Sequence, residues 1–345
     1  MIEIDGSIGG GQILRTALSL SAITQKPFRI KNIRKSRPKP GLKAQHIKCV
    51  EGVAQLCNAK FSGCTLKSKE LEFIPNKLNP KSLSIDIGTA GSISLFLQAM
   101  IPPIIHAGKN ISIEVFGGTD TMWCPPIDYF KEVFLPHIRK YANYEFKLLK
   151  RGYYPKGAGH VILKLKPQKL VDIRIKNITL LEFKDVLVIK GISHASMDLM
   201  KRRVAERQAK TAELILKDYS TDISNEYSTT KSTGSGIVLW ALTGDDDDGI
   251  DFDNPIIFGA DSLGKKGKSV PEVAQVAADE VLKLIKQKSC LDKLMADQML
   301  LYLGLYPNSR IKVPEISDHI KTNINTIEKF LDVKFKIEDD IISVE

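Results

Sequence analysis

Residues 111–118, ISIEVFGG, are followed by residues 125–141, PPIDYFKEVFLPHIRKY, and this pair decides the fold. The first stretch alternates apolar and polar residues, as in a strand buried on one face, whereas the second places apolar residues at helical spacing. Two further alternating stretches follow, YEFKLLK at 144–150 and HVILKLK at 160–166. The order strand, helix, strand, strand predicts a small sheet covered by a helix.

The same order of elements occurs twice more along the chain. One copy comprises residues 28–34, 41–57, 59–63 and 71–75, and the other comprises 310–315, 319–331, 333–339 and 341–345. A further helical stretch precedes each unit, at 12–23, at 90–101, and at 272–285 running on to 296–305. This period of about 100 residues predicts an α+β protein with three related βαββ-type modules, each a small sheet covered by helices.

The segment from about Lys176 to Lys268 does not fit this period. It contains strand patterns at 186–191 and 236–242 and a long basic helical pattern at 200–217. These elements predict an inserted α/β domain. The expected divisions are a catalytic domain at 1–176, the insert at 177–270 and the rest of the catalytic domain at 271–345.

Composition limits the class of protein. The chain has 345 residues, of which 43% are hydrophobic and 26% charged, an ordinary balance for a globular protein with a full core. No apolar run reaches the roughly 18–20 residues of a membrane span, and residues 1–7 do not resemble a signal peptide. We therefore expect a cytoplasmic protein with no membrane partner. The net charge of +10 suits a polyanion such as nucleic acid, although a lysine-rich proteome produces the same excess.

Residue patterns for a structural metal are weak. The five cysteines show no C-x-x-C spacing, which favours reduced thiols over a zinc site or a disulfide framework. The histidines other than His319 form no H-x-x-x-H pair. The turn GDDDDG at 244–249 could bind a cation, but four adjacent aspartates are more typical of a solvated loop.

Two glycine-containing loops could meet phosphate groups. DGSIGGGQILRTAL at 5–18 places three glycines between a strand and a helix, where backbone N–H groups and the helix dipole favour an anion. It matches neither of the common nucleotide-loop templates, and Arg15 is either a phosphate ligand or a surface arginine. NIRKSRPKPGLKAQH at 32–46 displays five basic residues on a proline-stiffened loop, which suits a polyphosphate or RNA backbone unless the loop is simply solvated.

A third loop, FGGTDTMWCPPIDYF at 116–130, follows a strand and carries flat apolar groups. Trp123, Pro125, Pro126 and Tyr129 could hold a nucleobase or could be packing residues.

His319 lies where a helix is predicted to begin. Apolar residues at 320, 324, 327 and 331 follow helical spacing, and Ser317 and Asp318 are both good N-caps. The positive end of the helix dipole lowers the pKa of an imidazole there, so a neutral ring keeps a lone pair for nucleophilic attack beside a phosphate-binding helix end. A histidine that only supplements the cap is the alternative.

Taken together, these stretches resemble the RNA 3'-terminal phosphate cyclases. Seven motifs match that family in the right order across nearly the whole chain: DGSIGGGQILR, RPKPGLKAQH, GTAGSISLFLQ, GGTDTMWCPPIDYF, RGYYPKGAGHV, ADQMLLYL and SDHIKTNI. The resemblance implies a large domain of three βαββ-type repeats and a smaller inserted domain with thioredoxin-like topology. It also implies that ATP adenylylates a histidine, that AMP passes to an RNA 3'-phosphate, and that the vicinal 2'-OH closes a 2',3'-cyclic phosphate.

The resemblance assigns roles residue by residue. It implies that His319 is the nucleophile and that Arg15, Arg34, Gln45 and His46 line the phosphate and RNA site. The residues expected around the nucleotide are Gln98, Pro125, Tyr129, Asp297 and Gln298. ATP is the expected cosubstrate, RNA with a 3'-phosphate end the expected partner, and Mg²⁺ or Mn²⁺ the expected ion, with unassigned ligands.

Three positions depart from the family pattern. Ile8 stands where the family usually has a metal-binding glutamate, in a loop that is two residues shorter. Leu294 replaces an aromatic or histidine, and Ala44 replaces an arginine. Two other functions stay open: a non-catalytic scaffold for ribosomal-RNA processing, whose members lack the histidine, and an enolpyruvyl transferase, which would give His319 and the basic insert no role.

Overall fold

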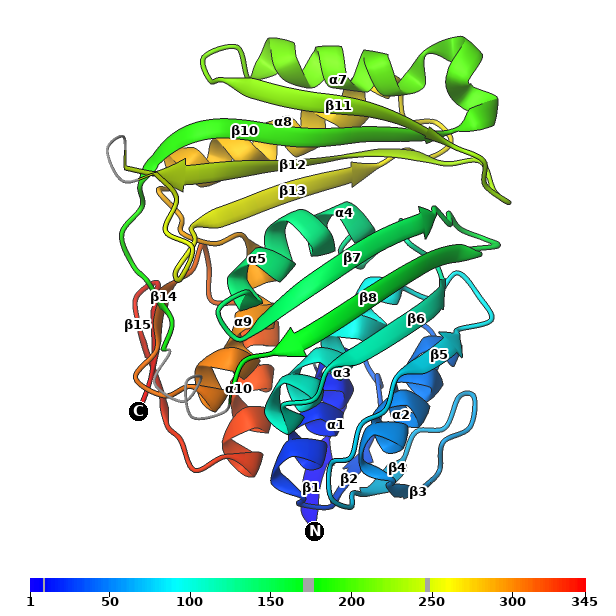
Figure 1. Cartoon of the computed structure of the whole chain (residues 1–345), viewed down its shortest axis with the longest axis vertical. Helices are drawn as coiled ribbons and strands as arrows, with labels where there is room; N and C mark the ends of the chain where they lie inside the picture. The colour runs from blue at the N-terminus through cyan, green and yellow to red at the C-terminus, as the bar shows by residue number, and fades with distance from the viewer. Residues whose placement is uncertain (9, 170–176, 246–248) are drawn as a thin grey trace.

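The computed structural model describes residues 1–8, 10–169, 177–245 and 249–345, and four sheets of four strands organise these residues (Figure 1). The first sheet has the order β1-β2-β4-β3, with β1 parallel to β2 and the other pairs antiparallel. Its elements in chain order are β1 (Ile2–Asp5), α1 (Gln12–Thr24), β2 (Phe28–Lys31), α2 (Ala44–Cys57), β3 (Lys60–Ser62) and β4 (Leu71–Ile74).

The second sheet contains the stretch 111–118 and has the order β5-β6-β8-β7. Every second residue of β6 is buried, from Ile111 to Gly117, as the alternating pattern predicts. The predicted helix at 125–141 is a short α-helix, a π-helical turn and a second short α-helix. The elements are β5 (Leu83–Asp86), α3 (Ile93–Ala107), β6 (Ile111–Gly117), α4 (Ile127–Tyr129), η1 (Phe130–Phe134), α5 (Leu135–Ile138), β7 (Ala142–Lys150) and β8 (Gly159–Pro167).

The third sheet is built from segments far apart in the chain. Its order is β9-β14-β16-β15, with β9 parallel to β14. In each of these three sheets the first and second strands pair in parallel, while the fourth strand lies between the second and third. The elements of the third are β9 (Thr179–Leu180), α9 (Lys293–Leu305), β14 (Arg310–Lys312), α10 (Asp318–Phe330), β15 (Phe335–Glu338) and β16 (Ile341–Val344).

The fourth sheet lies at one end of the molecule and is covered by α7 and α8 (Figure 1). The sequence predicts one helix at 200–217, but a 3₁₀ helix ends before Arg203, whose φ of 49° is left-handed, and α7 begins after it. The elements are β10 (Asp185–Ser196), η2 (Met197–Arg202), α7 (Val204–Ile215), β11 (Thr221–Ser228), β12 (Ser235–Gly244), β13 (Ile257–Leu263) and α8 (Val270–Lys286), and the order is β11-β10-β12-β13.

The prediction of a continuous helical stretch at 272–305 is wrong. It is divided into α8, which packs on β12, β13 and α7, and α9, which packs on α10. The cation site considered at GDDDDG falls mostly outside the described residues, since only Asp245 and the two glycines are described. No helix in the described ranges is both long and apolar enough to cross a membrane.

Helix α1 is largely buried in the core. It contacts α2, α3 and α10, and its residues from Ile13 to Ile23 are buried except Arg15. Because every residue from Thr16 to Ile23 is buried, which is more than two full turns, the helix is surrounded rather than exposed on one face. The mixture of small mixed sheets and packed helices confirms the predicted α+β class.

The core also encloses a titratable ring, His137 of α5, which is 2% exposed. Its Nδ1 lies 2.8 Å from the Val133 carbonyl oxygen, so Nδ1–H donates and the ring is neutral. Burial lowers the pKa of His137 to about 4, with only a partial opposing effect from that hydrogen bond.

We predict that His137 destabilises the protein in acid. The folded-state pKa lies below the unfolded value, so stability is complete above pH 6.5 and declines as the pH falls toward 4. The slope from one such group reaches about 1.4 kcal/mol per pH unit. Urea unfolding between pH 8 and pH 4 should show a shallower decline for His137→Gln than for the native chain. If the free energy of unfolding falls equally with pH in both proteins, the prediction is wrong. The difference in this free energy at pH 8 gives the cost of the substitution itself.

Candidate active site

Three helices from opposite ends of the chain meet at the N-terminus of α1. Thr16 Oγ1 donates to Asn323 Oδ1 of α10 at 2.7 Å, and Asn323 Nδ2 donates to the carbonyl oxygen of Asp297 in α9 at 3.2 Å. Gln12 Nε2 donates to the same carbonyl at 3.1 Å. The N-cap of α1 is Gly11. Because glycine has no side chain, the N-cap makes no side-chain hydrogen bond to the first N–H groups of this helix. Such a helix end favours an anion.

His319 is on the first turn of α10, as predicted. Ser317 is the N-cap, and its Oγ accepts a hydrogen bond from Ile320 N at 3.2 Å. Partial burial lowers the pKa of His319, and the positive charges of Arg37, Lys293 and Arg15 lower it further. Its Nδ1 is buried and has no hydrogen-bond partner among the described residues. The imidazole is therefore neutral, and its Nδ1 points away from solvent.

The glycine loop and the basic loop meet beside this histidine. Gly10 has a φ of +66°, and a Cβ there would lie 3.1 Å from Arg37 Nη2. A Cβ on Gly11 would lie 2.5 Å from His46 Nε2 and 3.3 Å from Arg15 Nη1. Glycine is therefore required at both positions, because the loop backbone touches the basic side chains directly.

Arg15 carries a charge without a counter-ion. Within the described ranges its guanidinium forms no hydrogen bond or ion pair, although the thiols of Cys49 and Cys124 and the carboxyl of Asp297 lie within electrostatic range. Partial burial lowers the pKa of Arg15, but a guanidinium stays protonated. A partly buried cation that lacks a protein partner favours an anionic ligand.

A cavity of about 40 Å³ is lined in part by Arg15. Three other residues predicted for the site from the sequence, Gln98, Asp297 and Gln298, also line it. Gln98 Nε2 donates to Gln298 Oε1 across it at 2.6 Å. Ligand pockets generally enclose several hundred Å³, so the cavity admits at most a part of a nucleotide. The lining residues are Gln12, Arg15, Thr16, Ser19, Gln98, Phe134, Asp297, Gln298, Leu301, Tyr302 and Asn323.

Asp297 joins this cavity to the start of α10. Burial raises the pKa of its carboxyl to about 7, against the opposing effects of Lys293, the Ser317 hydroxyl and Arg15. The Oδ1 atom is buried without a hydrogen-bond partner among the described residues. Asp297 can therefore carry a proton near neutral pH at a point that also contacts the cap of the His319 helix.

The other predicted phosphate residues are held by backbone groups. His46 Nδ1 accepts from Lys43 N at 3.0 Å, so its Nε2 carries the proton, and burial with the charge of Arg15 lowers the pKa of His46 to about 3. Gln45 Oε1 accepts from Ser92 N at 2.9 Å. Arg34 Nη1 donates to the carbonyl oxygens of Lys39 and Gly41, each at 2.9 Å, and thereby holds the proline-containing loop together.

Pro125 and Tyr129, predicted beside the nucleotide, do not line this cavity. Both are buried, and Tyr129 Oη donates to the Asp292 carboxylate, 2.7 Å from Oδ1 and 2.8 Å from Oδ2. Asp292 also caps α9 and accepts from Gly259 N of β13 at 2.9 Å. In this structure Tyr129 therefore connects α4 to α9 and the fourth sheet. The role of Asp292 was not predicted, because no local sequence pattern links residues 163 positions apart.

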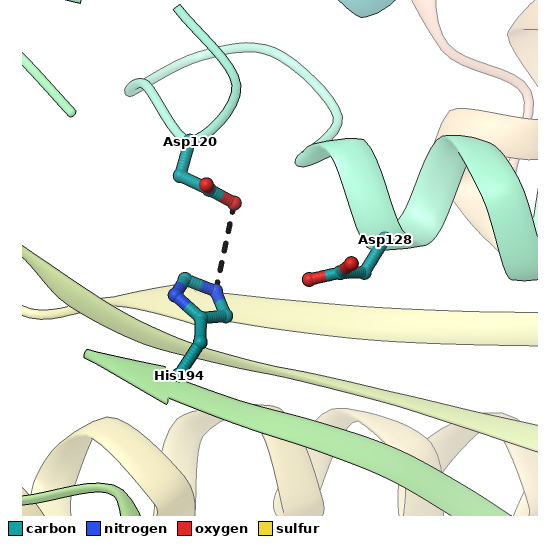
Figure 2. Close-up of side chains that lie close together, drawn as sticks. All are labelled: Asp120, Asp128 and His194. Atoms are coloured by element: carbon teal, nitrogen blue, oxygen red, sulfur yellow. Dashed lines mark ion pairs between the residues drawn. The ribbon is translucent and has the colours of Figure 1, made fainter. Parts of the chain in front are cut away.

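A second buried group of charges lies between the loop after β6, α4 and β10. Asp120, Asp128 and His194 point toward one another, with His194 Nε2 3.5 Å from Asp120 Oδ1 (Figure 2). Arg151 Nη1 lies 2.7 Å from Asp128 Oδ2, and its Nη2 lies 2.6 Å from Glu226 Oε2. Burial raises the pKa of both aspartates and, with Arg151, lowers that of His194 to about 3. A guanidinium therefore supplies the positive charge here, and the group connects the second and fourth sheets.

The residue types at the position expected for the ATP-linked ion do not suit a metal. Ile8 is 57% exposed and offers no ligand atom. Asp5 Oδ1 accepts from Ser7 N and Asn32 Nδ2, and Asp5 Oδ2 accepts from Ser7 Oγ. The hydrogen bonds from Asn32 and Ser7 lower the pKa of the Asp5 carboxyl and organise the turn after β1.

Comparison with known proteins identifies the family of this chain. Residues 7–337 match the family model of RNA 3'-terminal phosphate cyclase. A protein of that name from Pyrococcus furiosus is 42% identical over 99% of this chain and 96% of its own length. Proteins of the same name from Methanococcoides burtonii and Saccharolobus solfataricus are each 42% identical, over 100% and 98% of this chain and 99% and 96% of their own lengths. The chain therefore belongs to the RNA 3'-terminal phosphate cyclase family.

Proposed function

We propose that this protein converts an RNA 3'-terminal phosphate to a 2',3'-cyclic phosphate at the expense of ATP, through a covalent adduct of AMP on His319. The observation that carries the proposal is the position of the His319 ring in the first turn of α10, with its Nδ1 buried. Partial burial and the charges of Arg37, Lys293 and Arg15 lower the pKa of this imidazole. These cations favour the triphosphate and hold the imidazole in its unprotonated, nucleophilic form.

In the first step the Nε2 lone pair of His319 attacks the α-phosphorus of ATP and pyrophosphate leaves. Nε2 is the favoured atom because Nδ1 is buried. Protonation of the linked imidazole makes it a good leaving group, so an oxygen of the RNA 3'-phosphate displaces it and takes AMP. The vicinal 2'-OH then attacks the same 3'-phosphorus, loses its proton, and expels AMP as the cyclic phosphate forms.

Arg15 and the open end of α1 are proposed to hold the phosphates. Arg15 lacks a counter-ion among the described residues, and the N–H groups of α1 lack a side-chain cap. We assign Gln98, Asp297 and Gln298 to the nucleotide side of the site, with Gln45 and His46 toward the RNA. A divalent ion held mainly by the ATP phosphates would neutralise the leaving pyrophosphate.

We also propose that the three sheets with equal strand order are copies of one βαββ-type module and that the fourth sheet is an inserted domain with thioredoxin-like topology. The boundaries predicted at 176–177 and 270–271 need adjustment, because β9 pairs with β14 and α8 packs on β12 and β13. The insert then extends from after Leu180 to the end of α8.

We predict that His319→Ala abolishes transfer of AMP from α-labelled ATP to the protein. The reason is the loss of the only proposed nucleophile. His160→Ala, on β8 and paired with Glu114, is the matched control and should label like the native chain. Label retained in His319→Ala would contradict the assignment. A native chain that never labels would favour the non-catalytic scaffold.

We predict that Arg34→Lys impairs both stability and RNA cyclisation. Arg34 Nη1 donates to both the Lys39 and the Gly41 carbonyl oxygens, and the lysine side chain, which is one bond shorter, does not carry its nitrogen to that point. A lost bond costs about 1 kcal/mol. Urea unfolding should therefore show a decrease of about 1–2 kcal/mol in the free energy of unfolding. Unchanged stability with lost cyclisation would instead assign Arg34 directly to phosphate.

We predict that adenylylation requires Mg²⁺ or Mn²⁺ and that the protein binds this ion weakly, because Ile8 supplies no ligand. Ile8→Glu should shift the metal titration of the adenylylation rate to lower concentration, and Ile8→Gln, of similar size without the charge, should shift it less. If the native chain already saturates at micromolar metal, a different carboxylate is a ligand.

A further inference from the structure

We propose that Trp123 is a stacking platform for a base near the 3' end of single-stranded RNA. Trp123 is 93% exposed on the turn between β6 and α4. The inference rests on the proposed function only for the identity of the nucleic acid. Stacking of bases on aromatic rings is tolerant of sequence, which suits an enzyme that recognises an end rather than a base.

The turn holds the indole in a fixed place. Ile127 N donates to Thr119 O at 2.9 Å and closes the loop, and Cys124 Sγ donates to Thr121 O at 2.9 Å inside it. Trp123 itself has a φ of 65°, which is unfavourable for a bulky L-residue and persists only where the surroundings impose it. A rigid display lowers the entropy lost when a base stacks.

The platform lies next to the proposed phosphate site. The carbonyl oxygen of Pro125, two residues after Trp123, accepts from Ser94 Oγ at 2.6 Å, and Ser94 Oγ lies 3.3 Å from Ser92 Oγ. Ser92 N donates to Gln45 Oε1 at 2.9 Å, and the next residue, His46, lies with Arg15 against Gly11. An RNA whose terminal phosphate reaches Arg15 therefore has Trp123 within a short length of chain from it.

The surrounding surface fits a phosphate backbone better than a protein partner. Asp120, on the same loop, forms an isolated β-bridge with Tyr153. This bridge places the loop that follows Tyr153 beside the turn, and Tyr154 of that loop is 72% exposed. Two exposed lysines lie here, Lys156 on that loop and Lys231 on a neighbouring one. The two loops are joined by a hydrogen bond from Lys156 N to Ser232 Oγ. Neither lysine forms an ion pair with a described carboxylate. Flat rings with free lysines are the usual elements of a single-strand site.

Adenine of ATP is the competing ligand for the indole. Gln98, Asp297 and Gln298, which we assign to the nucleotide, line the cavity beside Arg15, whereas Trp123 is exposed to solvent and does not line that cavity. Stacking of RNA and stacking of ATP on Trp123 would give different fluorescence titrations, so one experiment distinguishes the two ligands.

Intrinsic fluorescence is a direct test, because the chain has two tryptophans and the other, Trp240, is 5% exposed. A single-stranded oligoribonucleotide with a 3'-phosphate should quench the emission of the exposed indole without ATP, and Trp123→Phe should lose this quenching. Quenching by ATP alone, or by neither ligand, would overturn the proposal. Quenching by RNA in a protein that never adenylylates His319 would support the platform and reject only the proposed function.

Binding of labelled RNA gives the second measurement. Trp123→Gly removes the ring and relieves the positive φ, so we expect an unchanged or higher Tm with a Kd raised about 5- to 150-fold. Phe252→Ala removes an aromatic that is 66% exposed in the loop before β13 and should change the Kd less than twofold. A Tm that falls by many degrees in Trp123→Gly, or an unchanged Kd, would overturn the proposal.

Discussion

The hydrogen bond from Thr16 to Asn323 joins the two ends of the chain, and the candidate site depends on it. It lies in the core, where an unpaired hydroxyl or amide would be costly, so α1 and α10 can pack in only one register. Asn323 in turn binds the Asp297 carbonyl and sets α9 against both helices. The open N-terminus of α1 and the first turn of α10 are thereby held side by side.

The electrostatics of the site follow from this packing. Arg15, Arg37 and Lys293 come from three different segments, and each opposes protonation of His319. An isolated set of such charges would repel, and the free energy stored in this repulsion favours a ligand with several negative charges. Burial, together with the charges of Arg15, Arg34 and Lys43, keeps His46 neutral beside Gly11. The anion therefore meets N–H groups and guanidinium groups rather than a further titrating ring. The site is therefore organised for phosphate before phosphate arrives.

Local patterns predicted much of this arrangement. The alternation in 111–118 predicted β6, and the apolar spacing after Ser317 predicted the start of α10 and its cap. They could not predict contacts across the chain. Tyr129 was expected at the nucleotide, whereas its hydroxyl binds Asp292, and Arg151 joins three carboxylates from separate elements. The break at Arg203 was also invisible, because the residues on both sides have good helix propensity and only the left-handed backbone separates them. The hydrogen bonds from Arg34 Nη1 to two carbonyls of its own loop were likewise not predicted, and contact of Arg34 with phosphate stays a prediction.

The central claim is that AMP becomes bonded to the nitrogen of one particular side chain, and tandem mass spectrometry tests it most directly. The native protein is incubated with ATP and a divalent ion, kept at alkaline pH to preserve a phosphoramidate, and digested. The account predicts AMP on His319 in the peptide that contains the start of α10. AMP on Lys293, an amine whose charge acts on His319, or on His46, would contradict it.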